Sequence, residues 1–127
     1  MADVLLIEPN PVMSLGLNWL LRQSGHSLLA ELEGGQHVAA VLQQRPPQAV
    51  ILELNLPDAD GYEVLRQVRA ASAGARVIVA TAAASSAAVR RCRQLGADVF
   101  LAKPLRPRLI VSALAELEGR AEAPEEE

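Results

Sequence analysis

Four short apolar runs in this sequence each end on side chains that could bind a charged group. The polar ends are Glu8-Pro9-Asn10, Glu53-Leu54-Asn55, Thr81-Ala82 and Lys103-Pro104. Carboxylates attract cations, whereas a hydroxyl and an ammonium can donate to anions. An isolated acid at the end of such a run is usually a solvated loop residue. Two acids, a hydroxyl and a lysine together favour one polar cluster, provided that the fold brings the four ends to one place.

Motifs for other kinds of site are missing from the sequence. It contains neither of the phosphate loops GxGxxG and GxxxxGK[ST], no Cys/His group at zinc-ligand spacing and no GxSxG nucleophile motif. His26 follows a predicted helix and His37 opens another, and we expect both to be surface residues rather than ligands. The polar cluster is therefore the main candidate for function.

The apolar runs have the length of strands and alternate with segments of helical periodicity. The predicted strands cover residues 4–7, 27–32, 49–54, 77–80 and 99–102. Several are continuously apolar, as in strands that are buried on both faces. Five strand–helix pairs with short loops are typical of a parallel sheet with helices on both faces. The carboxyl ends of such strands meet at one edge, where the sites of open α/β proteins lie.

Capping residues indicate where the intervening helices begin. The predicted helix starts are Asn10-Pro11, Asp60, Ser85 or Ser86, and Pro107. In the first helix, the apolar residues at helical spacing are Val12, Leu15, Trp19 and Leu20. That spacing is typical of an amphipathic helix, which packs its apolar face on a sheet.

Composition favours one folded domain. Half of the 127 residues are apolar, which is enough for a sizeable core. The net charge of -3 gives no electrostatic footprint for nucleic acid. No apolar run reaches the roughly 18–20 residues of a membrane span, no basic segment starts a signal peptide, and the single Cys92 fits a reducing compartment, so we expect a cytoplasmic protein. We expect the domain over residues 1–119 and an acidic tail that cannot pack over residues 120–127.

Two further motifs complete a recognisable pattern, namely Leu56-Pro57 with Asp60-Gly61, and Gly96-Ala97-Asp98 ahead of Lys103-Pro104. Over residues 4–117, the chain resembles the receiver domain of bacterial response regulators in two-component phosphorelay signalling. The resemblance implies a flavodoxin-like (βα)5 three-layer sandwich with a parallel five-stranded sheet of order 2-1-3-4-5. It also implies a pocket in which an aspartate after strand three takes a phosphoryl group from a histidine kinase, with Mg²⁺ held by two acids after strand one.

Three residues match the roles that this resemblance implies. Thr81 stands at the hydroxyl and Lys103 at the lysine that bind the phosphoryl oxygens. Phe100 stands at the aromatic residue that changes rotamer on activation.

Four positions bear on the acceptor and the metal. Glu53 replaces the acceptor aspartate, and Glu8 and Pro9 replace the two metal-binding acids. Asn55 falls where the family offers a backbone carbonyl to the metal. Mg²⁺ demands near-ideal octahedral oxygen geometry, and a displacement of about 1 Å, comparable to one extra methylene, can cost on the order of a hundredfold in rate. We therefore expect weak or absent Mg²⁺ binding, no cofactor and no catalytic residue.

The resulting hypothesis is a pseudo-receiver, not an enzyme, that signals through protein–protein contacts without aspartate phosphorylation. Lys103 should lie within salt-bridge reach of Glu53, as a partly exposed pair. Glu53 then either imitates a phosphorylated aspartate or simply fills space beside Lys103. The alternative hypothesis is a Mg²⁺-dependent phosphoacceptor in a histidine-kinase phosphorelay, and a third is a ligand-binding flavodoxin-like domain, against which the missing phosphate loop argues.

By analogy with the family, we expect the partner surface on the face made by helix four, strand five and helix five. A homodimer through this face is a further expectation. The residues assigned to the face are Val89, Cys92, Arg93, Phe100, Arg106 and Ile110.

Overall fold

Five strands and five helices alternate along the chain, as the periodicity predicts. The computed structural model describes residues 2–122, and the side chains of residues 2–116. The elements are β1 (Asp3–Ile7), α1 (Pro11–Gln23), β2 (Ser27–Leu32), α2 (Val38–Gln44), β3 (Ala49–Leu52), α3 (Gly61–Ala71), β4 (Arg76–Thr81), α4 (Ser86–Gln94), β5 (Val99–Ala102) and α5 (Pro107–Glu122).

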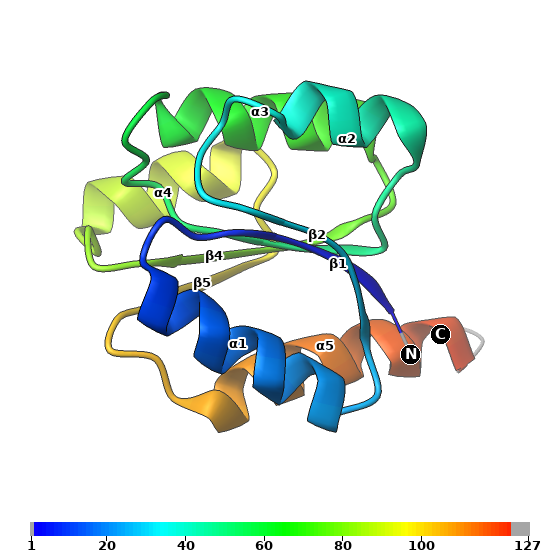
Figure 1. Cartoon of the computed structure of the whole chain (residues 1–127). Helices are drawn as coiled ribbons and strands as arrows, with labels where there is room; N and C mark the ends of the chain where they lie inside the picture. The colour runs from blue at the N-terminus through cyan, green and yellow to red at the C-terminus, as the bar shows by residue number, and fades with distance from the viewer. Residues whose placement is uncertain (1, 123–127) are drawn as a thin grey trace.

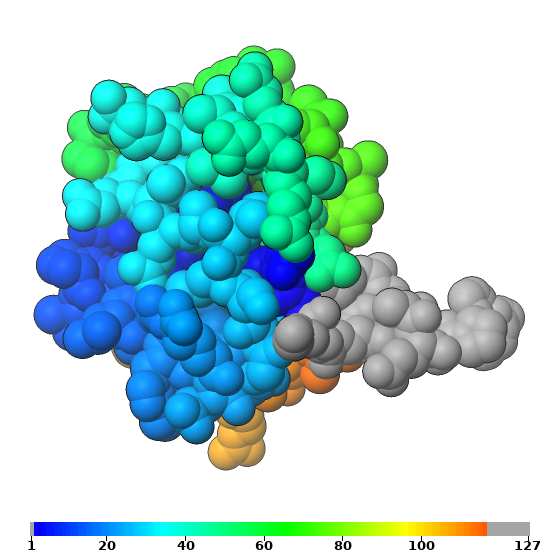
Figure 2. Space-filling model, turned by 45° about the vertical axis from the view of Figure 1, so that its right-hand side comes forward, coloured from blue at the N-terminus to red at the C-terminus, as the bar shows by residue number. Residues whose placement is uncertain are grey.

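The strands form one parallel sheet in the order β2-β1-β3-β4-β5, which confirms the predicted topology. Helices α1 and α5 cover one face of the sheet, and α2, α3 and α4 cover the other (Figure 1). Strands β3 and β4 are buried along their whole length, whereas β2 is a half-exposed edge strand beside α1. Figure 2 shows this β2 side of the molecule, with α1 and α2 flanking the strand.

The core has two layers because alternate strand residues point to opposite faces of the sheet. On one face, Leu5 and Ile7 of β1 pack with Val38 of α2 and Leu65 of α3. On the other face, the strand residues Leu6, Ile51 and Ile78 share a core layer with helix residues. These helix residues are Leu21 of α1 and Ile110 and Leu114 of α5. Each layer is built almost wholly from aliphatic side chains, and together they fix the sheet edge that carries the polar cluster.

The predicted helix starts are confirmed. The Asn10 side chain accepts hydrogen bonds from the backbone N–H groups of Val12 and Met13, and Pro11 occupies the first helical position. Asp60 caps α3, and of the two candidate serines it is Ser85 that caps α4. These caps satisfy N–H groups that the first turn of a helix leaves without partners, so each loop enters its helix at a defined residue.

The apolar spacing in α1 does not mark its buried face. Val12, Leu15 and Trp19 are 78%, 72% and 63% exposed, while Leu17 and Leu21 are buried against the sheet. Apolar residues surround this helix on nearly all sides, so periodicity alone offered two faces and packing on the sheet selected the other one.

Three further predictions about exposure are wrong. His26 is buried, with its Nδ1 accepting a hydrogen bond of 3.0 Å from the N–H of Ala2, because the α1–β2 turn folds back over the start of β1. Cys92 and Ile110, assigned to the partner face, are fully buried in the two core layers. They point inward because α4 and α5 each pack one side on the sheet.

Helix α5 continues to Glu122, and the rest of the predicted acidic tail lies outside the described residues. The domain boundary near residue 119 therefore stays a prediction. Within residues 2–122, no helix combines the length and the apolar character needed to cross a bilayer.

Candidate functional site

Backbone pairing brings the four predicted polar ends together at the carboxyl edge of the sheet. The ladder continues one residue past the strands, because the N–H of Glu53 donates to the carbonyl of Ile7 at 3.0 Å and the N–H of Lys103 donates to the carbonyl of Thr81 at 2.9 Å. Parallel register therefore sets Glu53 beside the β1 end and Lys103 beside the β4 end.

Lys103 lies at the centre of the cluster. Its Nζ is 2.8 Å from Oε1 of Glu8 and 2.7 Å from Oε1 of Glu53, which confirms the predicted contact between Lys103 and Glu53. The pair is partly exposed only at Lys103, whose side chain is 16% exposed, whereas the carboxylates of Glu8 and Glu53 are only 3% and 5% exposed and are more buried than expected. The cluster is a buried ion triad with two acids and one base.

The two glutamates are held in the same way by their own loops. Oε2 of Glu8 accepts a hydrogen bond of 2.9 Å from the N–H of Asn10, and Oε2 of Glu53 accepts one of 2.9 Å from the N–H of Asn55. Both loops carry the pattern Glu-X-Asn. Sequence reasoning missed this backbone anchoring, although the repeated pattern at two strand ends was the available signal.

Charge and hydrogen bonding decide the protonation of Glu53. Burial by itself raises the pKa of this carboxyl, but the Asn55 N–H, the Lys103 ammonium and the Thr81 hydroxyl outweigh it and lower the pKa below its ordinary value. Glu53 is therefore ionised at neutral pH.

Lys103 behaves in a complementary way. Burial lowers the pKa of its ammonium, but the hydrogen bonds and charges of Glu53 and Glu8 outweigh this effect and raise the pKa. One cation and two anions leave the cluster with a net charge of about -1, and the ammonium stays charged well above neutral pH.

Thr81 completes the lining of the cluster. It is fully buried, its hydroxyl bonds to the Glu53 carboxylate, and its Oγ1 accepts a hydrogen bond of 3.1 Å from the N–H of Ala83. Both the Thr81 hydroxyl and the Lys103 ammonium thus already bind the Glu53 carboxylate.

The remaining predicted residues surround the triad. Pro9 is half-buried next to Glu8 and brings no side-chain oxygen, and Asn55 is exposed at the start of the β3–α3 loop. Phe100 on β5 is half-buried and packs against the core layer under α3 and α4.

The donor set does not suit a divalent cation. Each of the four carboxylate oxygens of Glu8 and Glu53 already accepts from Lys103 or from a backbone N–H. Mg²⁺ prefers octahedral oxygen ligands, and the described residues contain no group of three or more acidic, His or Cys side chains placed to hold a metal ion. All four carboxylate oxygens of this pocket therefore already have hydrogen-bond donors.

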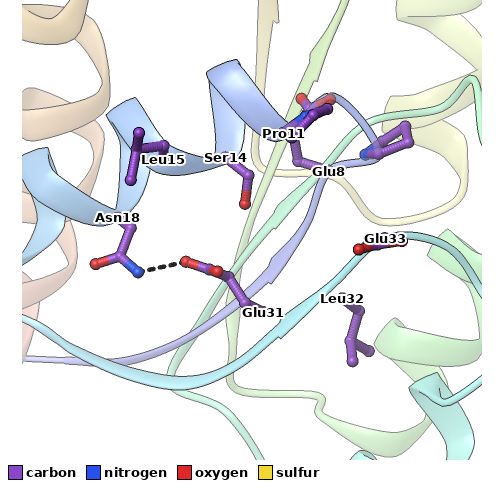
Figure 3. A pocket seen from close by; sticks show the side chains of 9 residues that line it. Glu8, Pro11, Ser14, Leu15, Asn18, Glu31, Leu32 and Glu33 are labelled. Carbon is purple, nitrogen blue, oxygen red and sulfur yellow. Dashed lines mark hydrogen bonds between the residues drawn. The ribbon is translucent and has the colours of Figure 1, made fainter.

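A hollow of about 420 Å³ opens beside Glu8, between α1 and the end of the edge strand β2 (Figure 3). Pro11, Ser14 and Asn18 of α1 line one side, and Glu31 and Glu33 line the other. The hollow is acidic, so it adds negative potential beside the triad.

Comparison with known proteins adds an independent result. The sequence model of the protein family described as the response regulator receiver domain matches residues 4–115 of the chain. The chain belongs to the response regulator receiver family. Receivers of this family are signalling modules of two-component systems, which contact kinases and effectors.

Individual relatives support the same assignment. The chain is 33% identical over 124 residues to the probable transcriptional regulatory protein SgaR of Hyphomicrobium methylovorum, covering 96% of this chain and 59% of that protein. It is 24% identical over 111 residues to the chemotaxis protein CheY of Bacillus subtilis, covering 87% of this chain and 92% of CheY. The chain thus spans less than two thirds of SgaR and nearly all of CheY.

Among solved structures, the receiver domain of the sensor histidine kinase PA1611 from Pseudomonas aeruginosa is similar, with a TM-score of 0.81 and 28% identity over 93% of this chain and 98% of that one. That domain was solved with a magnesium ion coordinated in its active-site cleft.

Proposed function

We propose that this receiver domain signals through protein contacts and does not accept a phosphoryl group. The observation that carries the proposal is the bridging position of Lys103, whose Nζ lies within 2.8 Å of both Glu8 and Glu53. The resemblance assigns this lysine to phosphoryl oxygens, and here two ionised carboxylates hold it instead.

Glu53 takes the place that a phosphoryl group would need. Its carboxylate contacts Lys103 and Thr81, the two side chains that the family directs at the phosphoryl oxygens. A fixed negative charge therefore stands where a receiver otherwise gains one transiently. This arrangement supports output that is independent of aspartate phosphorylation.

The oxygen atoms of the pocket support the same proposal. Phosphoryl transfer depends on positioning and on neutralising charge, and Mg²⁺ supplies much of both. Pro9 contributes no side-chain ligand, and the oxygens of Glu8 and Glu53 are already bonded. The domain would then be a non-enzymatic module without a cofactor.

The surface for a protein partner remains a proposal as well. On the α4–β5–α5 face, Arg93 and Arg106 are exposed, and Val89 and Phe100 are half-buried. These four residues form the corrected version of the predicted face, on a protein that we place in the cytoplasm and that does not itself bind nucleic acid.

The alternative is a Mg²⁺-dependent phosphoacceptor. Retention of Thr81 and Lys103 favours it, as does the magnesium ion in the related PA1611 domain. In that case Glu53 or a nearby acid such as Asp58 would take the phosphoryl group.

Intact-mass spectrometry after incubation with acetyl phosphate and Mg²⁺ separates the two functions. We expect no acid-labile phosphoryl adduct on the parent protein. The matched control is Glu53→Gln, which keeps the shape of the side chain and removes its nucleophile. An adduct on the parent that disappears in Glu53→Gln would establish the phosphoacceptor and overturn the proposal.

A further inference from the structure

The largest exposed apolar side chains of the described residues gather on two neighbouring helices. Val12, Leu15 and Trp19 lie on α1, and Leu109 and Val111 lie on α5, with exposed fractions between 37% and 78%. Figure 1 shows α1 and α5 side by side on one face of the sheet. Singly exposed apolar residues are ordinary, but several large ones on one face of a helix, as on α1, mark an interaction surface.

The exposed face of α1 is a regular seam. Val12, Leu15, Gly16 and Trp19 follow the spacing i, i+3, i+4, i+7, which places them on one side of the helix, opposite the buried Leu17 and Leu21. The sequence carries no charged residue from Pro11 to Leu21. A helix that is apolar on both sides is suited to packing on both sides.

Gly16 lies in the middle of this seam, and no contact or backbone angle within the chain requires a glycine there. A Cβ added at Gly16 would meet no atom within 4 Å, and its φ is not positive. Glycine inside a helix is destabilising relative to alanine, so a site with open space would favour a larger residue. Its small size matters only if another backbone approaches the helix there.

A groove runs beside the seam between α1 and the start of α5. It has a volume of about 430 Å³. Apolar side chains dominate the lining, among them Val12, Leu17, Trp19, Leu105 and Ile110. The groove can accept a large side chain from a partner helix.

We propose that a second copy of this chain covers this face, with the two α1 helices packed antiparallel and crossing at Gly16. A two-fold axis through the crossing point would set Gly16 against Gly16, which lets the backbones approach closely. The same axis would place Trp19 of each copy near the Val12 end of the other, over its groove. An uncharged apolar seam is self-complementary, as an isologous interface requires.

Charge complementarity selects a second copy as the occupant. Arg22 lies six residues after Gly16, about 9 Å along the helix axis, and Pro11 lies five residues before it, about 7.5 Å in the other direction. Glu33 lines the same hollow as Pro11, whereas Glu31 accepts a hydrogen bond from Asn18 further along the helix (Figure 3). An antiparallel pair therefore brings the exposed Arg22 of each copy, which within its own chain donates to the neutral Asn18 side chain, level with Glu33 of the other.

The size of the face sets the strength of the dimer. The α1 helix has 13 residues, so at 1.5 Å per residue it is roughly 20 Å long. One helix face of that length buries less than the about 800 Å² per partner of standard interfaces. We therefore expect a reversible dimer with a dissociation constant on the order of tens of micromolar rather than an obligate one.

Sedimentation velocity over roughly 5–500 µM tests the proposal, because this range spans dissociation of a dimer with that constant. The sedimenting mass should rise from monomer to dimer. Trp19 is the single tryptophan of the chain, so its emission should shift to the blue over the same range as the face becomes buried. Leu15→Glu and Trp19→Glu should each weaken association at least tenfold, whereas Ala70→Glu, which adds the same charge at an exposed site on α3, should not.

The antiparallel arrangement makes a sharper demand. Arg22→Glu should weaken the dimer, and adding Glu33→Arg to that variant should restore it. Circular dichroism checks that every variant keeps the parent fold. A purified protein that stays monomeric at all concentrations would overturn the proposal, and it would do so also if a different protein covers the α1 face in the cell. So would a dimer that tolerates both Leu15→Glu and Trp19→Glu, or one that is lost in Arg93→Glu on the α4–β5–α5 face. The outcome is independent of whether Glu53 accepts a phosphoryl group.

Discussion

Removing the Lys103 ammonium should expose the energetic role of the buried triad. Lys103→Met keeps most of the side-chain length and leaves Glu8 and Glu53, which are 3% and 5% exposed, without their cation. Breaking a buried ion pair by deleting one partner costs about 3–5 kcal/mol, because the remaining charge stays buried. Here two like charges remain. Against a typical total of about 5–15 kcal/mol, the variant should be folded but strongly destabilised.

The pH dependence gives this prediction its signature. In the parent, the pKa of Glu53 lies below its ordinary value of 4.5, so its contribution to stability is present above that pH and is lost as pH falls further. The pKa of Lys103 is raised above 10.5, so its contribution is present throughout the neutral range and is lost only at high pH. In Lys103→Met, burial is no longer offset by the ammonium and raises the pKa of the Glu53 carboxyl. The variant should therefore gain stability as pH falls from 8 to 5, where the parent changes little through this cluster.

Urea unfolding followed by far-ultraviolet circular dichroism between pH 5 and pH 8 measures both effects. Adding Glu8→Gln and Glu53→Gln to Lys103→Met removes all three charges and should recover much of the stability and abolish the pH dependence. Arg66→Met, which breaks an exposed pair with Glu63, should change stability little. A loss below about 1 kcal/mol in Lys103→Met at neutral pH, or a loss that does not vary with pH, would refute the account of a buried, ionised triad.

Three further outcomes follow from the same contacts. Lys103 is the only lysine of the sequence. An amine-acylating reagent at mild pH should therefore leave Lys103 unmodified in the folded parent and modify it in Glu53→Gln, and mass mapping of the folded parent that finds Lys103 modified would count against the closed triad. Gly61→Ala should lower the free energy of unfolding by about 3 kcal/mol or more, since a Cβ there would lie 2.1 Å from a backbone oxygen. Gly16→Ala, measured on dilute protein, should instead raise the free energy of unfolding by about 0.5–1 kcal/mol. Equal effects of the two substitutions in thermal unfolding would contradict the packing described. Pro9→Asp combined with Glu53→Asp should permit slow labelling by acetyl phosphate and raise Mg²⁺ affinity more than the two single changes together predict, because metal and acceptor act as one unit; a folded double variant that stays unlabelled would mean that the pocket departs from the family at more than these two positions.

Local chemistry in the sequence determined the order of the elements and the location of the site. Continuous apolar runs of four to six residues are typical of strands in a covered parallel sheet, and the caps at Asn10 and Asp60 fix where helices begin because their side chains satisfy the first free N–H groups. Parallel strands end at one edge of the sheet. The meeting of Glu53 with Lys103 was therefore predictable without coordinates.

Tertiary structure decided which face of each helix is buried. The α1 helix carries apolar residues on two sides, and only docking on the sheet showed that Leu17 and Leu21 face inward while Leu15 and Trp19 face outward. Cys92 was assigned to the surface by analogy, and it is buried because α4 packs that side on the sheet.

Tertiary structure also decided the electrostatics of the site. Glu8 and Lys103 are 95 residues apart in sequence, and no local pattern states that they share a hydrogen bond. The sequence shows that two acids and a lysine reach the same edge, but burial depends on how the loops close over them. That closure turns a pair expected to be partly solvated into a triad whose charges must satisfy one another, because water no longer does so.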